Sequence, residues 1–383
     1  MNTTETGSSQ ELLHVGVDLA KNVFQVAYKD EHRSRMINKQ LSRHQFEEFL
    51  TNSKRKLMVV FEACGSAHYW GRFCRELGHS PVMIPAEMTN SMTIGNKDDR
   101  NDAHSIWQAS FLPDLKTVSI RSESNQVEGM LLKSRDFLLK IDCQLNNFLK
   151  SMLYELGVPC KETSFDKTQI EAELLIKKAR ESDKEWADQF SAILKAMYEI
   201  RNTSIECVSD LTDKVNEAAD ASDLAQKLQT IPYVGKITSL AFANVMVEAD
   251  QFQNGRQFAD YCGEAPYHSG TGGKVSVKGI SRKGNKVLKR VLYEAASSLY
   301  CRVKVGQRSK SRRYYQSDWI SKLVDKKAYK VAVCAIANKM CRIAWAVAAS
   351  PDGKYDQDKT TLVSILNKSD EQLAAQKDQD SND

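Results

Sequence analysis

The chain has 383 residues, of which 42% are hydrophobic, so it can bury a sizeable core and is long enough for two or three folded units. Its 54 Lys and Arg residues against 49 Asp and Glu residues leave a net charge of only +5, which by itself neither favours nor excludes a nucleic-acid partner. No run of eighteen apolar residues and no hydrophobic leader segment occurs, so the sequence predicts a cytoplasmic protein with no membrane partner.

The first part of the chain, 12–121, alternates strand and helix patterns. Strands are expected at 14–18, 22–28, 57–62 and 80–85, and helices at 41–50 and 69–77. This alternation predicts an α/β layer with a mixed sheet. The polar N-terminal segment, 1–11, is expected to be disordered.

Four acidic residues stand out in this part of the chain. Asp18 and Glu62 each end an apolar strand, and Asp99 and Asp102 stand three residues apart where a helix is expected to begin. A carboxylate at the end of a buried strand is costly unless it is paired or binds metal, and carboxylate oxygens suit Mg²⁺. Because Mg²⁺ ions can clamp the oxygens of a phosphodiester, these residues predict phosphoryl transfer on DNA or RNA. The alternative is that each acid belongs to an ordinary solvated turn or first helical turn.

A helical pattern replaces this alternation from residue 122. Apolar residues recur at threes and fours from Val127 to Leu156, which predicts a long helix, and a second helical region is expected from about 168 to 219. We expect these helices to form a coiled coil over 122–222, either antiparallel or between subunits. Its role would be spacing or dimerisation, so the protein is expected to be a homo-oligomer, a dimer or a tetramer.

The region from 223 to 350 combines tight turns with a basic segment. The sequence IPYVG at 231–235 fits either a phosphate-binding helix-hairpin-helix, with Tyr233 where that motif usually has glycine, or a plain turn. A glycine-rich loop at 269–274 lacks the spacing of a P-loop, which disfavours an ATPase. Basic residues from 278 to 313, interleaved with Tyr and Trp, indicate a surface for a polyanion; the alternative is a solvated basic face.

Two further features complete the chain. An apolar helix is expected over 331–348, and an acidic disordered tail over 351–383. The nine cysteines are dispersed, with no C-x-x-C pair and no histidine spaced for zinc, so we expect buried free thiols and no structural zinc.

Several of these blocks carry a resemblance to a known family. The N-terminal blocks are VGVDLAK (15–21), FEACG (61–65) and NKDDRNDA (96–103), and the C-terminal blocks are IPYVG (231–235), CGEAP (262–266), SGT (269–271) and ISRKGN (280–285). Together they resemble the DEDD transposases of bacterial insertion sequences, the IS110 family, which is related to the Piv-type DNA invertases. The resemblance spans most of residues 12–350.

The resemblance implies a RuvC/RNase H-like α/β domain, a coiled coil of long helices, and a mainly α-helical C-terminal transposase domain that contributes a serine nucleophile. It implies a transposase or recombinase that cuts and rejoins DNA through a serine–DNA covalent intermediate, guided by a bridge RNA that the element encodes. Carried over residue by residue, the Mg²⁺-binding catalytic tetrad is Asp18, Glu62, Asp99 and Asp102, with Asp98 outside it.

The resemblance also places the nucleophile in the Ser-Gly block, at Ser269. Because Ser269 lies closer to Pro266 than in the family pattern, Thr271 and Ser276 remain alternatives, and His268 is either an assisting base or an ordinary histidine. Since the tetrad and Ser269 fall in different domains, their layout predicts a working site assembled between subunits. Nucleic-acid contacts are expected from Lys274, Lys278, Arg282, Lys283, Lys286, Lys289 and Arg290.

Two rival functions fit the same residues. A RuvC-like metal-dependent nuclease, such as a junction resolvase, would share the tetrad but would use water as the nucleophile and form no covalent adduct. A non-enzymatic nucleic-acid-binding protein on an RNase H-like scaffold would tolerate substitution of Asp18 or Glu62.

Overall fold

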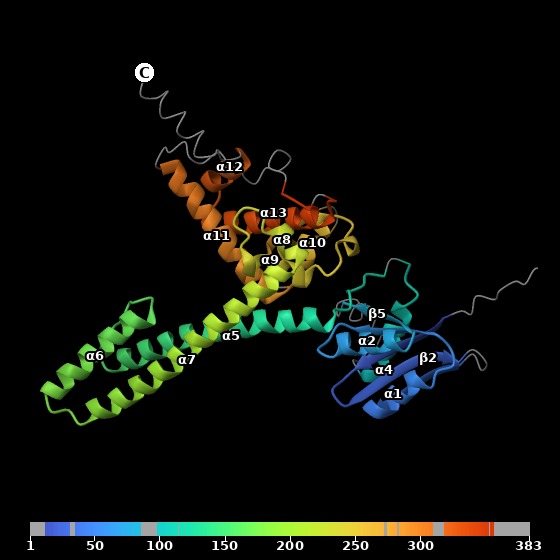
Figure 1. The fold of residues 1–383 in the computed structure, drawn as a ribbon, viewed down its shortest axis with the longest axis horizontal. Coiled ribbons are helices and arrows are strands. Elements are labelled where there is room, and N and C mark those ends of the chain that lie inside the picture. Colours follow the sequence, from blue (N-terminus) through green and yellow to red (C-terminus); the bar gives the residue numbers. More distant parts are fainter. Residues whose placement is uncertain are drawn as a thin grey trace, which may run out of the picture. The chain divides into compact units, whose positions relative to one another are not determined.

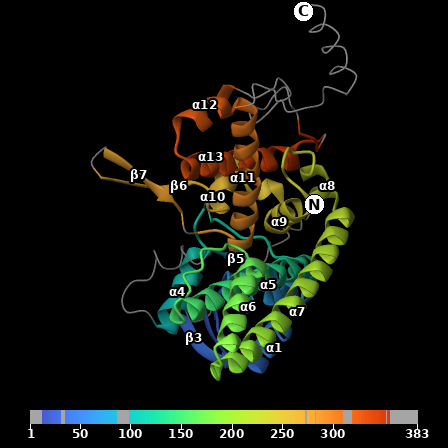
Figure 2. The same ribbon diagram turned by 90° about the vertical axis from the view of Figure 1, so that its left-hand side faces the viewer.

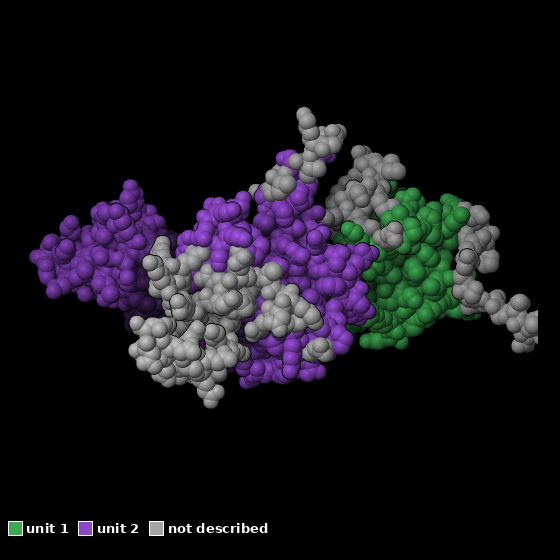
Figure 3. All heavy atoms as spheres, turned by 90° about the horizontal axis from the view of Figure 1, so that it is seen from above, with its two compact units in different colours: residues 1–124 green, residues 125–383 purple. Residues whose placement is uncertain are grey.

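The computed structural model describes residues 12–30, 35–85, 98–113, 115–271, 274–281, 283–308, 318–351 and 353–355. The chain divides into two compact units, 1–124 and 125–383 (Figure 3). The expected N-terminal disordered segment and the tail beyond residue 355 lie outside the described residues.

Unit 1 is built on a five-stranded mixed sheet with the strand order β3-β2-β1-β4-β5. The first three strands pair antiparallel, while β1, β4 and β5 run parallel to one another. The α/β layer and the mixed sheet predicted from the sequence are therefore confirmed. The strands are β1 (Leu13–Leu19), β2 (Val23–Asp30), β3 (Arg35–Ser42), β4 (Leu57–Glu62) and β5 (Ser80–Ile84).

Helices cover both faces of this sheet (Figure 1). On one face, Phe46 of α1 (Arg43–Thr51) and Trp70 of α2 (Ala67–Glu76) both contact Phe24 of β2, with ring centroids 5.1–5.2 Å apart. On the other face, Ile106 of α4 (Asp99–Ala109) packs against Val60 and Ile84. The strand β3 was not predicted, because its side chains are only partly buried and leave no apolar run to detect.

Unit 2 begins with three helices: α5 (Glu123–Glu155), α6 (Phe165–Glu181) and α7 (Trp186–Ala221). The single helical region expected at 168–219 is divided between α6 and α7 by a turn at 182–185, where Asp183 has a φ of 49°. Figure 1 shows α5 and α7 lying side by side as an elongated arm with α6 against them. A small shared core of eight buried residues includes Leu149, Phe165 and Leu194, so all three helices, not two, are packed together.

The rest of unit 2 is a mainly helical body with one β-hairpin. Its largest core spans residues from Leu132 to Tyr355 and thus includes the base of α5 and α7. Tyr355 is buried in this core, and its backbone N–H donates to the Thr230 hydroxyl at 2.9 Å. Residue 355 therefore still packs on this body, although the tail was expected to begin at 351. The elements are α8 (Asp223–Leu228), α9 (Lys236–Val245), η1 (Ala249–Gln251), α10 (Gly255–Tyr261), β6 (Pro266–Thr271), β7 (Lys274–Ile280), α11 (Lys286–Arg308), α12 (Asp318–Lys326) and α13 (Tyr329–Ala349).

The helix α13 is the apolar helix predicted near the C-terminal end. It is long and apolar enough to cross a membrane by length and composition, and it is the one such helix among the described residues. Its side chains Val333, Ile336 and Met340 are completely buried in the protein core, which accounts for its apolar character.

The nine cysteines form no disulfides. Cys74, Cys262 and Cys341 are buried as expected, and burial raises the pKa of the Cys74 thiol to about 12. The expectation of burial is wrong for four others, which lie on solvent-facing turns or helix surfaces: Cys64, Cys143, Cys207 and Cys301.

Candidate active site

Asp18 and Glu62 lie at the ends of two neighbouring parallel strands. Val17 of β1 pairs with Phe61 of β4, so Asp18 and Glu62 are the next residues on adjacent strands, which are about 4.8 Å apart. Because side chains alternate along a strand, both carboxylates belong to the face that carries Gly16 and Val60. The register of the sheet therefore brings together two acids that are 44 positions apart in the sequence.

The helix α4 crosses this same face at Gly16. A Cβ atom at Gly16 would lie 2.6 Å from the carbonyl oxygen of Ala103 and would overlap the backbone of Trp107. Only glycine lets the helix backbone approach the strand this closely. Since Asp18 follows Gly16 by two residues and Asp99 precedes Ala103 by one helical turn, the acids of the strand and of the helix share one side of the sheet.

Hydrogen bonds fix the first turn of α4 over the sheet. Asp98 is the N-cap: its carboxylate accepts from the backbone N–H of Asn101 at 2.8 Å. Buried Gln25, which faces Asp18 in the register, donates to Asn38 at 2.5 Å, and Asn38 donates to the Arg100 carbonyl at 2.8 Å. The turn carrying Asp99 and Asp102 is thus tied to β2 and β3, and Asp98 has a capping role of its own.

The chemistry of this acid set fits Mg²⁺, because all four side chains are carboxylates. No three His, Cys, Asp or Glu side chains are grouped as ligands of one metal ion within the ranges that the structure describes. The residues immediately before α4, 86–97, lie outside those ranges. The structure thus places the four acids on one side of the sheet without drawing them into a closed cage.

Ser269 lies in a β-hairpin and not in the glycine-rich loop that the sequence predicted. The strands β6 and β7 pair antiparallel, with Ser269 opposite Ser276 and Thr271 opposite Lys274. Figure 2 shows this hairpin extending away from the helices of unit 2. The Ser276 side chain is exposed, whereas the side chains of Ser269 and Thr271 lie outside the described part of the chain.

Two glycines allow the two turns at the base of the hairpin to pack against each other. Gly263 has a φ of 77° and Gly284 a φ of 89°, and a Cβ on either one would collide with the backbone of the opposite turn, at Lys283 or Cys262. The ammonium of Lys289 donates to the carbonyls of Gly263 at 2.9 Å, Ser281 at 2.6 Å and Lys283 at 3.3 Å. One half-buried cation therefore joins the chain entering the hairpin to the chain leaving it.

Glu264 is a buried acid at this base that the sequence analysis did not single out. Its side chain lies next to the start of β6 and is 5% exposed. Burial raises the pKa of the Glu264 carboxyl to about 7, while the nearby Lys289 ammonium acts in the opposite direction. The sequence signal was faint, because a single Glu between Gly263 and Ala265 reads as a turn residue.

The predicted nucleic-acid-binding residues separate into three groups. Lys289 makes the three carbonyl contacts just described, and Arg290 pairs with the buried carboxylate of Asp136 and with Glu294. Both cations thus stabilise unit 2 internally. Lys283 and Lys286 are exposed, and the remaining three side chains lie outside the described part: Lys274, Lys278 and Arg282.

The turn at 231–235 has a left-handed residue at the position where a helix-hairpin-helix usually has glycine. Tyr233 has a φ of 65°, the left-handed conformation for which that motif uses glycine, and Gly235 is the N-cap of α9. The turn joins α8 to α9 and its Ile231 is buried in the core. Tyr233 also packs against that core, which accounts for a large side chain at a strained position.

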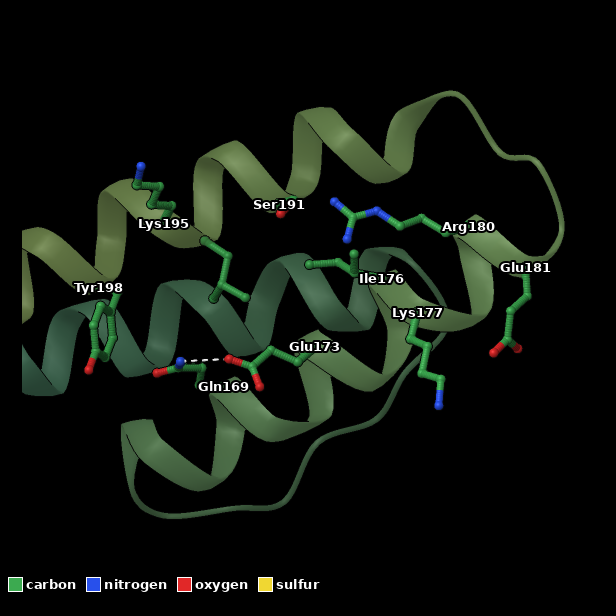
Figure 4. A pocket seen from close by; sticks show the side chains of 10 residues that line it. Gln169, Glu173, Ile176, Lys177, Arg180, Glu181, Ser191, Lys195 and Tyr198 are labelled. Carbon is green, nitrogen blue, oxygen red and sulfur yellow. Dashed lines mark hydrogen bonds between the residues drawn. The ribbon is translucent and has the colours of Figure 1, made fainter.

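A groove of about 430 Å³ lies between α6 and α7 in the arm (Figure 4). Its floor is formed by Ile176 and Leu194 of the small core, and its rim is charged. Gln169 donates to Glu173 at 2.7 Å across its edge. The groove contains none of the residues predicted for catalysis.

Comparison with known proteins decides the family. Residues 225–316, which include α9, the hairpin and all of α11, match the model described as "Transposase IS116/IS110/IS902 family". A probable family 20 transposase of Pseudomonas aeruginosa is 30% identical over 338 residues, covering 88% of this chain and 96% of the relative. The chain belongs to the IS116/IS110/IS902 transposase family.

Other members of the family match over a similar extent. The transposase for insertion sequence element IS1328 of Yersinia enterocolitica is 27% identical over 339 residues, covering 87% of this chain and 96% of its own length. The transposase for insertion sequence element IS1111A of Coxiella burnetii is 28% identical over 340 residues, covering 89% of this chain and 90% of its own length. The resemblance read from the sequence blocks is confirmed.

Proposed function

We propose that this protein is the DNA transposase of an insertion sequence, cutting and rejoining DNA strands. The observation that carries the proposal is the pairing of Asp18 and Glu62 on adjacent strands, under a helix that begins with Asp99 and Asp102, in a member of a transposase family. We infer a RuvC/RNase H-like fold for unit 1, which the mixed sheet and the placement of these acids support.

The four carboxylates would hold Mg²⁺. When bound, the ion would supply positive charge to the phosphate oxygens where negative charge develops. The residues themselves contribute a fixed set of oxygen ligands: Gly16 admits the helix to the sheet, and the hydrogen bonds of Gln25 and Asn38 hold its first turn. Removing divalent metal should abolish DNA cleavage, and Mg²⁺ should restore it.

The nucleophile in this proposal is the hydroxyl of Ser269. Its oxygen forms a bond to a DNA phosphorus, the bond from that phosphorus to one sugar oxygen breaks, and the proton lost by serine is balanced by one gained at the leaving oxygen. The number of phosphoester bonds is conserved, so the strand can be rejoined when a second sugar hydroxyl attacks the phosphoserine. Thr271 and Ser276 are the alternative hydroxyls in the same hairpin.

We further propose that a bridge RNA encoded by the element guides the protein, and that the helical arm forms a coiled-coil contact between copies in a dimer or tetramer. The exposed apolar side chains of the arm support such a contact, among them Phe137, Phe148 and Ile200. Expressing the protein together with the DNA that flanks its gene, and sequencing the RNA that copurifies, tests the first point. Only background RNA in that sample would contradict it.

The tetrad is tested by comparing two neighbouring acids. Asp99→Asn should lower the rate of DNA strand cleavage by at least about a hundredfold, because it removes a charged metal ligand. Asp98→Ser is the matched control: it also removes a carboxylate, but serine keeps the helix cap, so cleavage should persist. Equal activity of the two variants would count against the metal role of Asp99.

A further inference from the structure

A second cavity, of about 470 Å³, lies between α10 and α13 in unit 2. Three cationic side chains line it, Arg256 from α10 and Lys339 and Arg342 from α13, together with the indole of Trp345. These residues lie outside the basic segment at 274–290 and outside the serine hairpin. No acidic residue is among the described residues that line this cavity.

The charge in this cavity is not neutralised by the folded part of the chain that the structure describes. None of Arg256, Lys339 and Arg342 forms an ion pair with a carboxylate there. Burial, with a smaller contribution from the neighbouring Arg342, lowers the pKa of Lys339 below its ordinary range. Holding like charges together costs stability, and an anion between them would remove that cost.

Packing fixes the two helices that carry these side chains. Gly255 begins α10 directly against α13: a Cβ there would lie 2.9 Å from the carbonyl oxygen of Arg342. The indole N–H of Trp345 donates to the Ala249 carbonyl at 3.0 Å, and the Lys339 ammonium lies 5.5 Å from the ring centre of Trp319. The cavity thus lies between two helices that pack directly against each other.

We propose that this cavity binds a phosphate of a nucleic-acid backbone. Its volume exceeds that of one phosphate group, and the indole beside the cations offers an apolar surface for the adjoining sugar or base. The inference rests on the proposed function, since a transposase guided by RNA handles both DNA and RNA. It assigns part of that binding to Arg256, Lys339 and Arg342, outside the segment that the sequence indicated.

The test measures binding of the full-length protein to fluorescent single-stranded DNA and RNA oligonucleotides over a series of salt concentrations. Lys339→Gln and Arg342→Gln should each weaken binding by about tenfold, the loss expected for one charge-assisted contact. Each should also reduce the slope of log affinity against log salt by about 1. The oligonucleotide that shows the loss identifies whether the cavity holds DNA or RNA.

Two variants complete the experiment. Lys214→Gln removes the same charge from α7, where Lys214 pairs with Glu217, and should leave both affinity and slope unchanged. Arg256 is exposed, so Arg256→Gln should keep the fold. It should show the same loss of affinity and of salt slope, and it serves as the test if the α13 variants are unstable. Unchanged binding of both oligonucleotides by Arg256→Gln and the α13 variants overturns the inference but leaves the function standing. Failure of the wild type to bind either oligonucleotide contradicts the function itself.

Discussion

At the scale of single residues, glycines decide where the functional elements approach one another. Gly16 admits α4 to the strand that carries Asp18, and Gly263 and Gly284 interlock at the base of the serine hairpin. The two hairpin glycines also have positive φ angles, so they meet both a steric and a conformational requirement. A side chain at any of the three would move a predicted catalytic residue.

Gly284→Ala should therefore destabilise unit 2. The left-handed backbone alone costs roughly 1–3 kcal/mol for a residue with a side chain, and the overlap with the Cys262 carbonyl adds to that. Gly279→Ala is the matched control on the same hairpin, because a Cβ there meets nothing within 4 Å. Urea unfolding of both variants checks this expectation, and equal midpoints would contradict it.

Glu264 should make stability depend on pH. The unfolded carboxyl ionises near its ordinary value of 4.5, whereas in the folded protein its pKa is about 7. Between those values the unfolded chain loses a proton that the folded chain keeps, so the free energy of unfolding falls as pH rises from 4.5 to 7, by up to roughly 3 kcal/mol.

Glu264→Gln should remove this contribution, since it has no proton to lose. Thermal unfolding measured from pH 4.5 to 8 should show that the variant is more stable than the wild type only above about pH 5. Glu206→Gln, an exposed acid on α7, should leave the wild-type profile intact. A gain of equal size at every pH would contradict the raised pKa.

At the scale of elements, hydrophobic periodicity predicted the strands and helices whose apolar residues are regularly spaced. Apolar spacing and glycine stops predicted the strands around Val17 and Phe61, the helix that ends before Gly78 and the long helix that ends before Gly157. The strand β3 and the break at Asp183 were missed, since one is a partly exposed edge strand and the other has neither glycine nor proline.

The break between α6 and α7 offers a direct test. Asp183 is exposed with a φ of 49°, so Asp183→Gly should raise the free energy of unfolding by roughly 0.5–1 kcal/mol. Ser182→Gly should lower it, because Ser182 has a φ of −106° and glycine only adds freedom to the unfolded chain. Calorimetry on both variants checks the direction of each change in the free energy of unfolding. A loss of stability in Asp183→Gly would contradict the turn geometry.

At the scale of the whole molecule, the candidate site could be predicted only in part. The four acids were found because two end buried strands and two open a helix, and the register then placed Asp18 beside Glu62. The internal roles of Lys289 and Arg290 could not be found, since a lysine bound to carbonyls and one facing DNA have the same sequence signature. The cavity at Arg342 was missed because its cations come from two segments that are far apart in the chain, so they form no basic run in the sequence.

The covalent step is the central claim, and trapping the protein–DNA adduct tests it most directly. The substrate is nicked DNA that carries the element's ends and its insertion site, and mass spectrometry locates the modified peptide. We predict a phosphoserine at Ser269 that disappears in Ser269→Ala, persists in Ser276→Ala and requires Asp99. An adduct that survives in Ser269→Ala, or cleavage that releases free ends with no adduct, would contradict the account.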